Sequence, residues 1–281
     1  MSIIEHALKK SRTSEQANRP RRTGGDALER TQPVATIDPE LRIVPLSVKV
    51  DSSLCRERRL LLDARDESDS ATVAAYRMLR TRLLQRARAK DWRVIAVTSA
   101  GPNDGKTLTA LNLALSMARD KSREIVLLDL DMRNPSVCRV LDVQPRHELR
   151  DYLEGGDHLR ELFFSVGSDN LLIAGSTRPT QHASELLASP RFEELLRSLR
   201  QGAVDPVVLI DLPPVLLTDD ALVVAPKVDA VLLVASEGVT SRAEFAKALD
   251  VLSEFPIAGV ALNRAAETAP GYDYSYNYNA D

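Results

Sequence analysis

The stretch "TSAGPNDGKT", residues 98–107, decides the fold. A phosphate-binding loop usually reads Gly, four free positions and then Gly-Lys-Ser/Thr. Gly105, Lys106 and Thr107 fit this pattern, whereas Ala100 takes the place of the first Gly. The stretch is therefore either an ordinary glycine-containing turn or a variant phosphate loop, and the segments around it decide between the two.

The flanking segments have the pattern of a strand before the loop and a helix after it. "RVIAVTS" is an apolar run typical of a buried strand, and "KTLTALNLALSMARD" repeats apolar residues at helical spacing. Between such elements, backbone N–H groups of the loop and of the helix N-terminus would surround the phosphates of a nucleotide, and Lys106 would reach their oxygens. The sequence therefore predicts a nucleotide site, with the Thr107 hydroxyl in the shell of a Mg²⁺ ion.

Three aspartates follow two later strand patterns. "IVLLDLDMRNP" ends one strand with Asp129 and Asp131, and their spacing of two sends both side chains to the same side of an extended chain. "VVLIDLPP" ends another with Asp211, where an acid is expected to hold Mg²⁺ directly or through water. One aspartate at a strand end is usually a cap or turn residue. Three in this order behind a phosphate loop predict a metal–nucleotide site.

The chain from about residue 93 alternates strand and helix patterns. The later predicted strands are "EIVLLDLD", "NLLIAGS", "PVVLIDLPP", "DAVLLVAS" and "IAGVALNR", and helices are predicted near 106–120, 190–201 and 241–255. Near-continuous Val, Ile and Leu runs suit a sheet that is buried on both faces. The alternation predicts a doubly wound, mostly parallel α/β sheet of the P-loop NTPase type.

Three parts are predicted along the chain: a largely flexible arm at 1–70, a P-loop domain at 71–265 and a tail at 266–281. The domain begins with "ATVAAYRMLRTRLLQRARAK", a predicted basic, amphipathic helix with Tyr76, Leu79 and Leu83 on one face. Within the arm, "LRIVPLSVKV" alternates like a short strand. The first dozen residues could form a short helix, either a frayed terminus or a docking peptide for a partner.

Composition limits the classes of function. The formal net charge is −3 and the pI about 5.9, so the chain has no global positive field and no nucleic-acid partner is expected. Cys55 and Cys138 lack metal-ligand spacing, which favours a reducing compartment and a cytoplasmic location. The apolar runs are shorter than the roughly 18–20 residues that span a bilayer, so any work at a membrane would need a partner.

The tail "APGYDYSYNYNAD" holds four of the six tyrosines of the chain, at every second residue. An edge strand with aromatic side chains on one face would explain this spacing. A flexible segment that offers tyrosine hydroxyls to an active site would explain it as well. The candidate phosphoacceptors are Tyr272, Tyr274, Tyr276 and Tyr278.

These motifs resemble those of the bacterial tyrosine kinases (BY-kinases) of the polysaccharide co-polymerase systems, within the deviant-Walker class of P-loop ATPases. The resemblance covers about residues 76–264 and the tail, with "TSAGPNDGKT" as Walker A, "LLDLDMRNP" as Walker A′, "VLIDLPP" as Walker B, and "SELLAS" after the middle strand. It implies ATP and Mg²⁺ as cofactors and transfer of phosphate to tyrosine.

The resemblance also implies roles for residues. Lys106, Asp129 and Asp131 would be catalytic, with Lys106 stabilising phosphate charge and the aspartates accepting the tyrosine proton. Thr107, Asp129 and Asp211 would hold the metal, and Arg133 would support the Walker A′ loop. The implied nucleotide-binding residues are Gly101, Pro102, Asn103, Asp104, Gly105, Lys106, Thr107, Thr109 and Asn263.

The implied biology is control of exopolysaccharide synthesis or export. A separate membrane protein of the chain-length-determinant type would activate the kinase and hold it at the inner membrane, and the kinase would be a homo-oligomer. The chain departs from the family pattern at Ala74, where the basic helix often has Glu, at Asn103, where Gly is usual, and at Leu212, where a hydroxyl residue is common. None of these changes removes a catalytic group.

Two other functions remain open from the sequence. A partitioning or division-site ATPase of the same class would release free phosphate, but such proteins usually carry a further Lys at the position of Gly101 and have no need of a tyrosine-rich end. A nucleotide-binding scaffold would use the tail and the basic helix for assembly alone.

Overall fold

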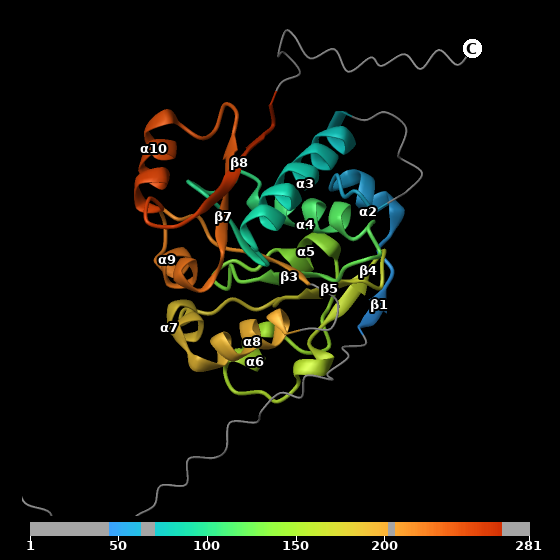
Figure 1. The fold of residues 1–281 in the computed structure, drawn as a ribbon. Helices are drawn as coiled ribbons and strands as arrows, with labels where there is room; N and C mark the ends of the chain where they lie inside the picture. The colour runs from blue at the N-terminus through green and yellow to red at the C-terminus, as the bar shows by residue number, and fades with distance from the viewer. Residues whose placement is uncertain (1–44, 63–70, 202–205, 266–281) are drawn as a thin grey trace, which may run out of the picture. The chain divides into compact units, whose positions relative to one another are not determined.

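An eight-stranded sheet lies between two layers of helices in the computed structural model, which describes residues 45–62, 71–201 and 206–265 (Figure 1). The described residues all belong to one compact unit, residues 37–281. The elements are β1 Leu46–Val48, α2 Ser52–Glu57, α3 Ala71–Lys90, β2 Val94–Ser99, α4 Lys106–Met117, β3 Ile125–Asp129, α5 Val137–Leu141, α6 Leu149–Leu153, η2 Leu159–Glu161, β4 Phe164–Val166, β5 Leu171–Ala174, α7 Ala183–Ala188, α8 Pro190–Arg200, β6 Val207–Asp211, α9 Asp220–Val224, η3 Ala225–Lys227, β7 Ala230–Ser236, α10 Arg242–Val251 and β8 Ile257–Asn263.

The strand order is β1-β4-β5-β3-β6-β2-β7-β8. All neighbouring strands run parallel except β4 and β5, which are antiparallel. The predicted doubly wound, mostly parallel sheet is thus confirmed. Because β6 is inserted between β3 and β2, the carboxyl ends of these three strands lie next to one another, and the phosphate loop starts at one of them.

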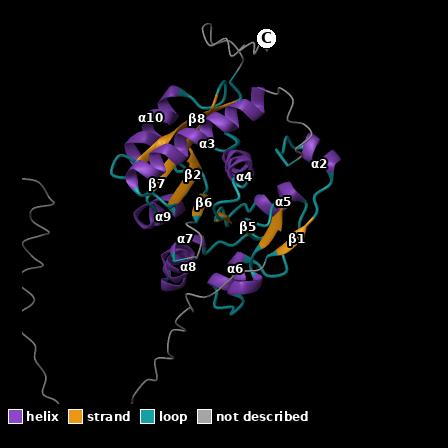
Figure 2. Cartoon of the chain, turned by 45° about the vertical axis from the view of Figure 1, so that its right-hand side comes forward, coloured by secondary structure: helices purple, strands orange, loops and turns teal. Residues whose placement is uncertain are grey.

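Successive residues of the central strands enter two separate cores. Val94, Ala96, Val126 and Leu128 pack with α6–α10, whereas Ile95 and its alternating neighbours pack with α3, α4 and α5. Figure 2 shows the helices on both sides of the strands. This double burial is why the strands read as continuous apolar runs rather than as alternating ones.

Local signals define two of the outer helices. α8 begins after Ser189, whose hydroxyl accepts from Phe192 N–H, and it has Pro190 in its first turn. α10 begins with a capping box between Ser241 and Glu244. Both helices were predicted, to within a few residues at each end. The short elements α5, α6, α7 and α9 were not, because five or six residues carry too little periodicity.

The basic helix α3 uses two of its arginines inside the fold. Leu83 is buried against the α4 side of the sheet, as predicted. Arg80 donates to the backbone carbonyl of Ser116 at 2.8 Å, and Arg86 donates to that of Ala258 at 2.6 Å. These bonds fasten α3 to the C-terminal end of α4 and to β8. No helix in the described ranges is both long enough and apolar enough to cross a bilayer.

Residues 45–62 differ from the flexible arm that was predicted for 1–70. β1 pairs with β4 at the edge of the sheet, and Cys55 and Leu60 are buried in the core beside α4. β1 lies within "LRIVPLSVKV", where a short strand was predicted, whereas the six-residue helix α2 is too short to stand out in sequence. The rest of the predicted arm, 1–44 and 63–70, and the tail 266–281 lie outside the described residues.

One buried asparagine holds this lead-in segment on α4. Asn112 is 1% exposed. Its Oδ1 accepts from Leu61 N–H at 3.0 Å, and its Nδ2 donates to Arg59 O at 2.9 Å. The amide therefore replaces two backbone hydrogen bonds that a regular element would supply.

We predict that Asn112→Ala lowers the free energy of unfolding by about 1–2 kcal/mol, because the part-buried Leu61 N–H and Arg59 C=O lose their partners. Limited proteolysis should then cut within residues 45–62 more readily. Asn170→Ala is the matched control, since Asn170 also donates to two carbonyls, of Asp120 and Arg123, at another turn. Equal cleavage of residues 45–62 in both variants would contradict a specific attachment through Asn112.

Candidate active site

The phosphate loop between β2 and α4 has two residues in the left-handed region. Asn103 has φ 62° and Gly105 has φ 87°. There is also no room for a side chain at position 105, because an added Cβ would collide with Nδ2 of Asn263. The glycine of the motif is therefore required both for conformation and for close approach.

Asp104 connects the loop to the turn after β7 and to the end of the edge strand β8. Its carboxylate accepts from Gly101 N–H at 3.0 Å and from the Thr240 hydroxyl at 2.7 Å. Asn263, at the end of β8, donates to the Asp104 carbonyl at 2.9 Å. Thr240 lies in the β7–α10 turn, where it also accepts from Ser236 N–H at 2.7 Å. Sequence reasoning missed Thr240, because no motif marks that turn.

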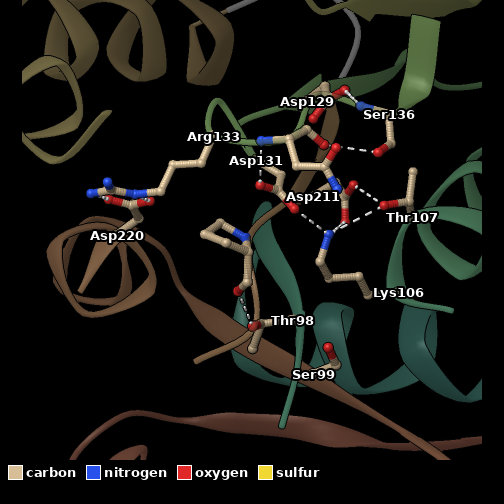
Figure 3. A network of polar contacts seen from close by, with 12 residues as sticks. Thr98, Ser99, Lys106, Thr107, Asp129, Asp131, Arg133, Ser136, Asp211 and Asp220 are labelled. Carbon is tan, nitrogen blue, oxygen red and sulfur yellow. Dashed lines mark hydrogen bonds and ion pairs between the residues drawn. The ribbon is translucent and has the colours of Figure 1, made fainter. Parts of the chain in front are cut away.

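Lys106 is the cation at the centre of the site (Figure 3). Its Nζ lies 2.7 Å from Asp131 Oδ2 and 3.7 Å from Asp211 Oδ1. Burial alone would lower the pKa of Lys106, but the charges of Asp211 and Asp131 outweigh it and raise the pKa above its ordinary value. Lys106 is therefore an ammonium ion at neutral pH, at the start of α4 directly after the phosphate loop.

Asp129 and Asp211 are neighbours because their strands are. They are register partners at the ends of β3 and β6, and both are 0% exposed. Asp129 Oδ2 accepts from Ser136 and Val137 N–H, each at 2.8 Å. Burial first, and then the charge of Asp211, raise the pKa of Asp129 to about 7. The same burial raises the pKa of Asp211, against the opposing effect of Lys106.

The carboxylates fit a divalent metal. The Thr107 hydroxyl donates to Asp211 Oδ2 at 2.6 Å, which places the hydroxyl and the carboxylate side by side. Oδ1 of Asp129 and Oδ1 of Asp211 are buried and have no hydrogen-bond partner among the described residues. Three carboxylates around one ammonium also leave an excess of negative charge where phosphates would bind. Hard oxygen ligands and surplus charge are what Mg²⁺ requires.

Arg133 points away from the phosphate loop toward α9 (Figure 3). Its guanidinium donates to both oxygens of Asp220, at 2.7 and 3.0 Å, and to the Ser184 hydroxyl at 3.0 Å. Asp220 is 0% exposed, so this bidentate pair fixes the turn after Asp131 from outside the site. Ser184 belongs to the "SELLAS" stretch, whereas nothing in the sequence singled out Asp220.

The structure brings most of the predicted site residues together. Gly101 to Gly105 form the loop, Lys106 and Thr107 begin α4, and Asp129, Asp131 and Asp211 face Lys106. Thr109 lies one turn into α4, where it is buried near Tyr76 of α3. Pro102 and Asn103 are exposed at the tip of the loop. The tyrosines of the tail, Tyr272, Tyr274, Tyr276 and Tyr278, lie outside the described residues.

Comparison with known families matches this fold and site. The ParA family model, described as NUBPL iron-transfer P-loop NTPase, matches residues 91–277. That range contains the phosphate loop and all three aspartates.

Similarity to individual proteins is more specific. The chain is 30% identical over 224 residues to the tyrosine-protein kinase Etk of Escherichia coli strain K12, which covers 77% of the chain and 30% of Etk. It therefore spans less than a third of Etk. It is 30% identical over 175 residues to the tyrosine-protein kinase CpsD of Streptococcus pneumoniae serotype 4, which covers 61% of the chain and 76% of CpsD.

A solved structure, the kinase domain of E. coli tyrosine kinase ETK, superposes with a TM-score of 0.67 at 27% identity, and the match covers 84% of the chain and 94% of that domain. The phosphate loop, the paired aspartates and these matches agree with one another. The chain belongs to the bacterial tyrosine-protein kinases, within the ParA-type P-loop NTPases.

Proposed function

We propose that the protein transfers the γ-phosphoryl group of ATP to tyrosine, with the tail tyrosines as acceptors, and thereby regulates exopolysaccharide synthesis or export. The observation that carries this proposal is the convergence of Lys106, Asp131 and Asp211 behind a phosphate loop. The similarity to Etk and CpsD, both tyrosine-protein kinases, supports the choice of tyrosine over water as acceptor.

The loop and Lys106 would bind and orient the triphosphate. Backbone N–H groups from Gly101 to Thr107 would surround the β- and γ-phosphates, and the Lys106 ammonium would exchange its contact with Asp131 for phosphate oxygens. Asp104, held by Thr240 and Asn263, would keep the loop in shape before the nucleotide arrives. The loop would then need little rearrangement when ATP binds. This lowers the entropic cost of bringing the reacting groups together.

Thr107, Asp129 and Asp211 would hold Mg²⁺, which neutralises phosphate charge when it is bound. In the transfer, the bond between the γ-phosphorus and the β–γ bridging oxygen breaks, a bond to the tyrosine oxygen forms, and ADP leaves. Asp129 and Asp131 would accept the proton of the tyrosine hydroxyl. Both are buried carboxylates, and an acceptor shielded from water keeps the proton from being lost to solvent.

The tail is long enough to be the acceptor. Tyr272 follows Asn263 by about nine residues, so an extended linker would reach roughly 30 Å, within one chain or to a neighbour. Each phosphate adds about −1.5 to −2 charges. A phosphorylated tail would be repelled by the three aspartates, so phosphorylation would release the tail from the site.

We also propose that the chain forms a homo-oligomer and works in the cytoplasm at the inner membrane. A membrane protein of the chain-length-determinant type would be its anchor and activator. If so, the purified chain should sediment with membranes that contain such a protein and stay in the supernatant with membranes that lack it.

Phosphate transfer to the tail can be measured directly. After incubation with ATP and Mg²⁺, mass spectrometry should find phosphate on residues 272–278. Lys106→Met should reduce this phosphate at least about 100-fold, because it removes the charge that stabilises the transferring group. Lys121→Met is the matched control, since Lys121 is an exposed lysine that contacts Asn170, and this variant should keep full activity.

Other outcomes of that experiment favour other functions. Release of inorganic phosphate with an unmodified tail would indicate a partitioning-type ATPase and contradict the kinase. If neither activity is found, even with membranes that contain the proposed partner, the chain is a nucleotide-binding scaffold.

A second prediction tests the loop geometry. Gly105→Ala should weaken binding of a fluorescent ADP analogue at least about tenfold, because alanine is strained at φ 87° and its Cβ would collide with Asn263. At Gly101 an added Cβ meets nothing within 4 Å, so Gly101→Ala is the matched control and should bind nearly as the parent does. Equal affinities in the two variants would rule out the steric role of Gly105.

A third prediction follows from the pKa of Asp129. Because the folded chain holds a proton on Asp129 up to about pH 7 and an unfolded chain only to about 3.8, the free energy of unfolding should fall as pH rises from about 4 to 7. Asp129→Asn keeps the shape without the charge, so at pH 8 it should be more stable than the parent by roughly 1–3 kcal/mol.

Urea unfolding at several pH values, without nucleotide or Mg²⁺, measures this difference. Near pH 3 the two proteins should be about equally stable, because Asp129 is then mostly neutral in both the folded and the unfolded chain. Asp91→Asn, with a 93% exposed side chain, should follow the parent at every pH. A parent and an Asp129→Asn variant with parallel pH profiles would contradict the raised pKa.

A further inference from the structure

We infer that His147, His158 and Glu161 form a second metal site, for a transition-metal ion such as Zn²⁺, outside the candidate active site. One ligand atom from each residue lies within 4.8 Å of the other two. The cluster shares no residue with the phosphate loop or with the aspartates around Lys106. The inference is therefore independent of the proposed kinase function.

The distances within the cluster match a metal shell better than a hydrogen-bonded group. Glu161 Oε2 lies 3.6 Å from His147 Nε2 and 3.4 Å from His158 Nδ1. A good N–H···O hydrogen bond is about 2.9 Å long. Tetrahedral Zn²⁺ with bonds of about 2.0–2.2 Å places its ligand atoms roughly 3.3–3.5 Å apart. Both imidazoles thus face the same carboxylate oxygen at nearly the edge lengths of a zinc site.

The two imidazole rings come from separate segments and lie against each other, with centroids 4.3 Å apart. His147 precedes α6, and its neighbour Glu148 is 9% exposed, while Leu149 N–H donates to Gly175 O at 3.0 Å. His158 immediately precedes the turn η2 and Glu161 is its last residue, and Glu161 N–H donates to His158 O at 3.1 Å. The buried Leu162 and Phe163 follow directly.

Both segments are therefore anchored by buried neighbours, so the three ligands are held near one another before any ion binds. Two imidazole nitrogens and one carboxylate are a ligand set that suits Zn²⁺ and neighbouring transition metals better than Mg²⁺. The His158 and Glu161 side chains are 53% and 52% exposed, so an ion has open access from solvent, and water would complete the shell. Bound metal would join the α5–α6 connection to the segment that leads into β4.

The test is calorimetric titration of the untagged full chain with Zn²⁺, without nucleotide and with excess Mg²⁺ to occupy the aspartates. We expect one saturable Zn²⁺ per chain and a rise in Tm. His147→Ala, His158→Ala and Glu161→Gln should each weaken Zn²⁺ binding at least about tenfold. Loss of a residue that only hydrogen-bonds a metal ligand already weakens metal binding by about that factor. Co²⁺ should show the strong visible bands of a low-coordinate site, and these bands should be lost in the same variants.

Two further variants serve as controls. His182 and Glu185 form a histidine–carboxylate pair at the same i,i+3 spacing as His158 and Glu161, but without a second histidine, so His182→Ala should not change the affinity. His6→Ala removes the remaining histidine of the chain and should also have no effect. Absence of saturable Zn²⁺ binding to the parent, or unchanged affinity in His158→Ala, would overturn the proposal. So would binding that is lost only in His6→Ala.

Discussion

The attraction between the Lys106 ammonium and the carboxylates of Asp131 and Asp211 is the interaction on which the candidate active site depends. Parallel pairing of β3 with β6 forces Asp129 and Asp211 into neighbouring positions, away from water. Buried like charges are tolerated only when they are neutralised or protonated. Lys106 supplies one positive charge against three carboxylates, and burial together with the charge of Asp211 raises the pKa of Asp129. The site is thus built with a deficit of positive charge, which a bound cation would fill.

Hydrogen bonds between distant segments also hold the same site together. Asp104 connects the phosphate loop to the turn after β7 through Thr240 and to the end of β8 through Asn263. On the other side, the Arg133–Asp220 pair fastens the turn that follows Asp131 to α9. Each contact joins a loop to an element that is distant in sequence. The geometry around Lys106 therefore depends on the whole carboxyl edge of the sheet, not on the phosphate loop alone.

Side-chain hydrogen bonds between distant segments also occur elsewhere in the fold. Asn112 holds the lead-in segment on α4, and Arg86 joins α3 to β8. The His147–His158–Glu161 cluster joins two loops near β4 in a comparable way. Its side chains converge without good hydrogen bonds. This difference distinguishes the cluster from the other contacts and fits the metal site proposed for it.

Sequence alone determined the central strands, the phosphate loop and the three aspartates, because each depends on a local pattern. The three-residue strand β4 was not predicted. Apolar runs predict buried strands, and Gly-Lys-Thr after such a run predicts a phosphate loop whatever the rest of the chain does. The long helices α4, α8 and α10 were predictable for the same reason.

Tertiary structure decided the rest. Asp129 faces Asp211 because β6 is inserted between β3 and β2. No single segment of the sequence specifies this strand order. Thr240 and Asp220 gained their roles only because folding brought them within hydrogen-bond distance of Asp104 and Arg133. The packing of residues 45–62 likewise depends on Asn112 and on the free edge of β4, two partners that are distant in sequence. Local patterns specify elements, whereas contacts between distant segments specify the site.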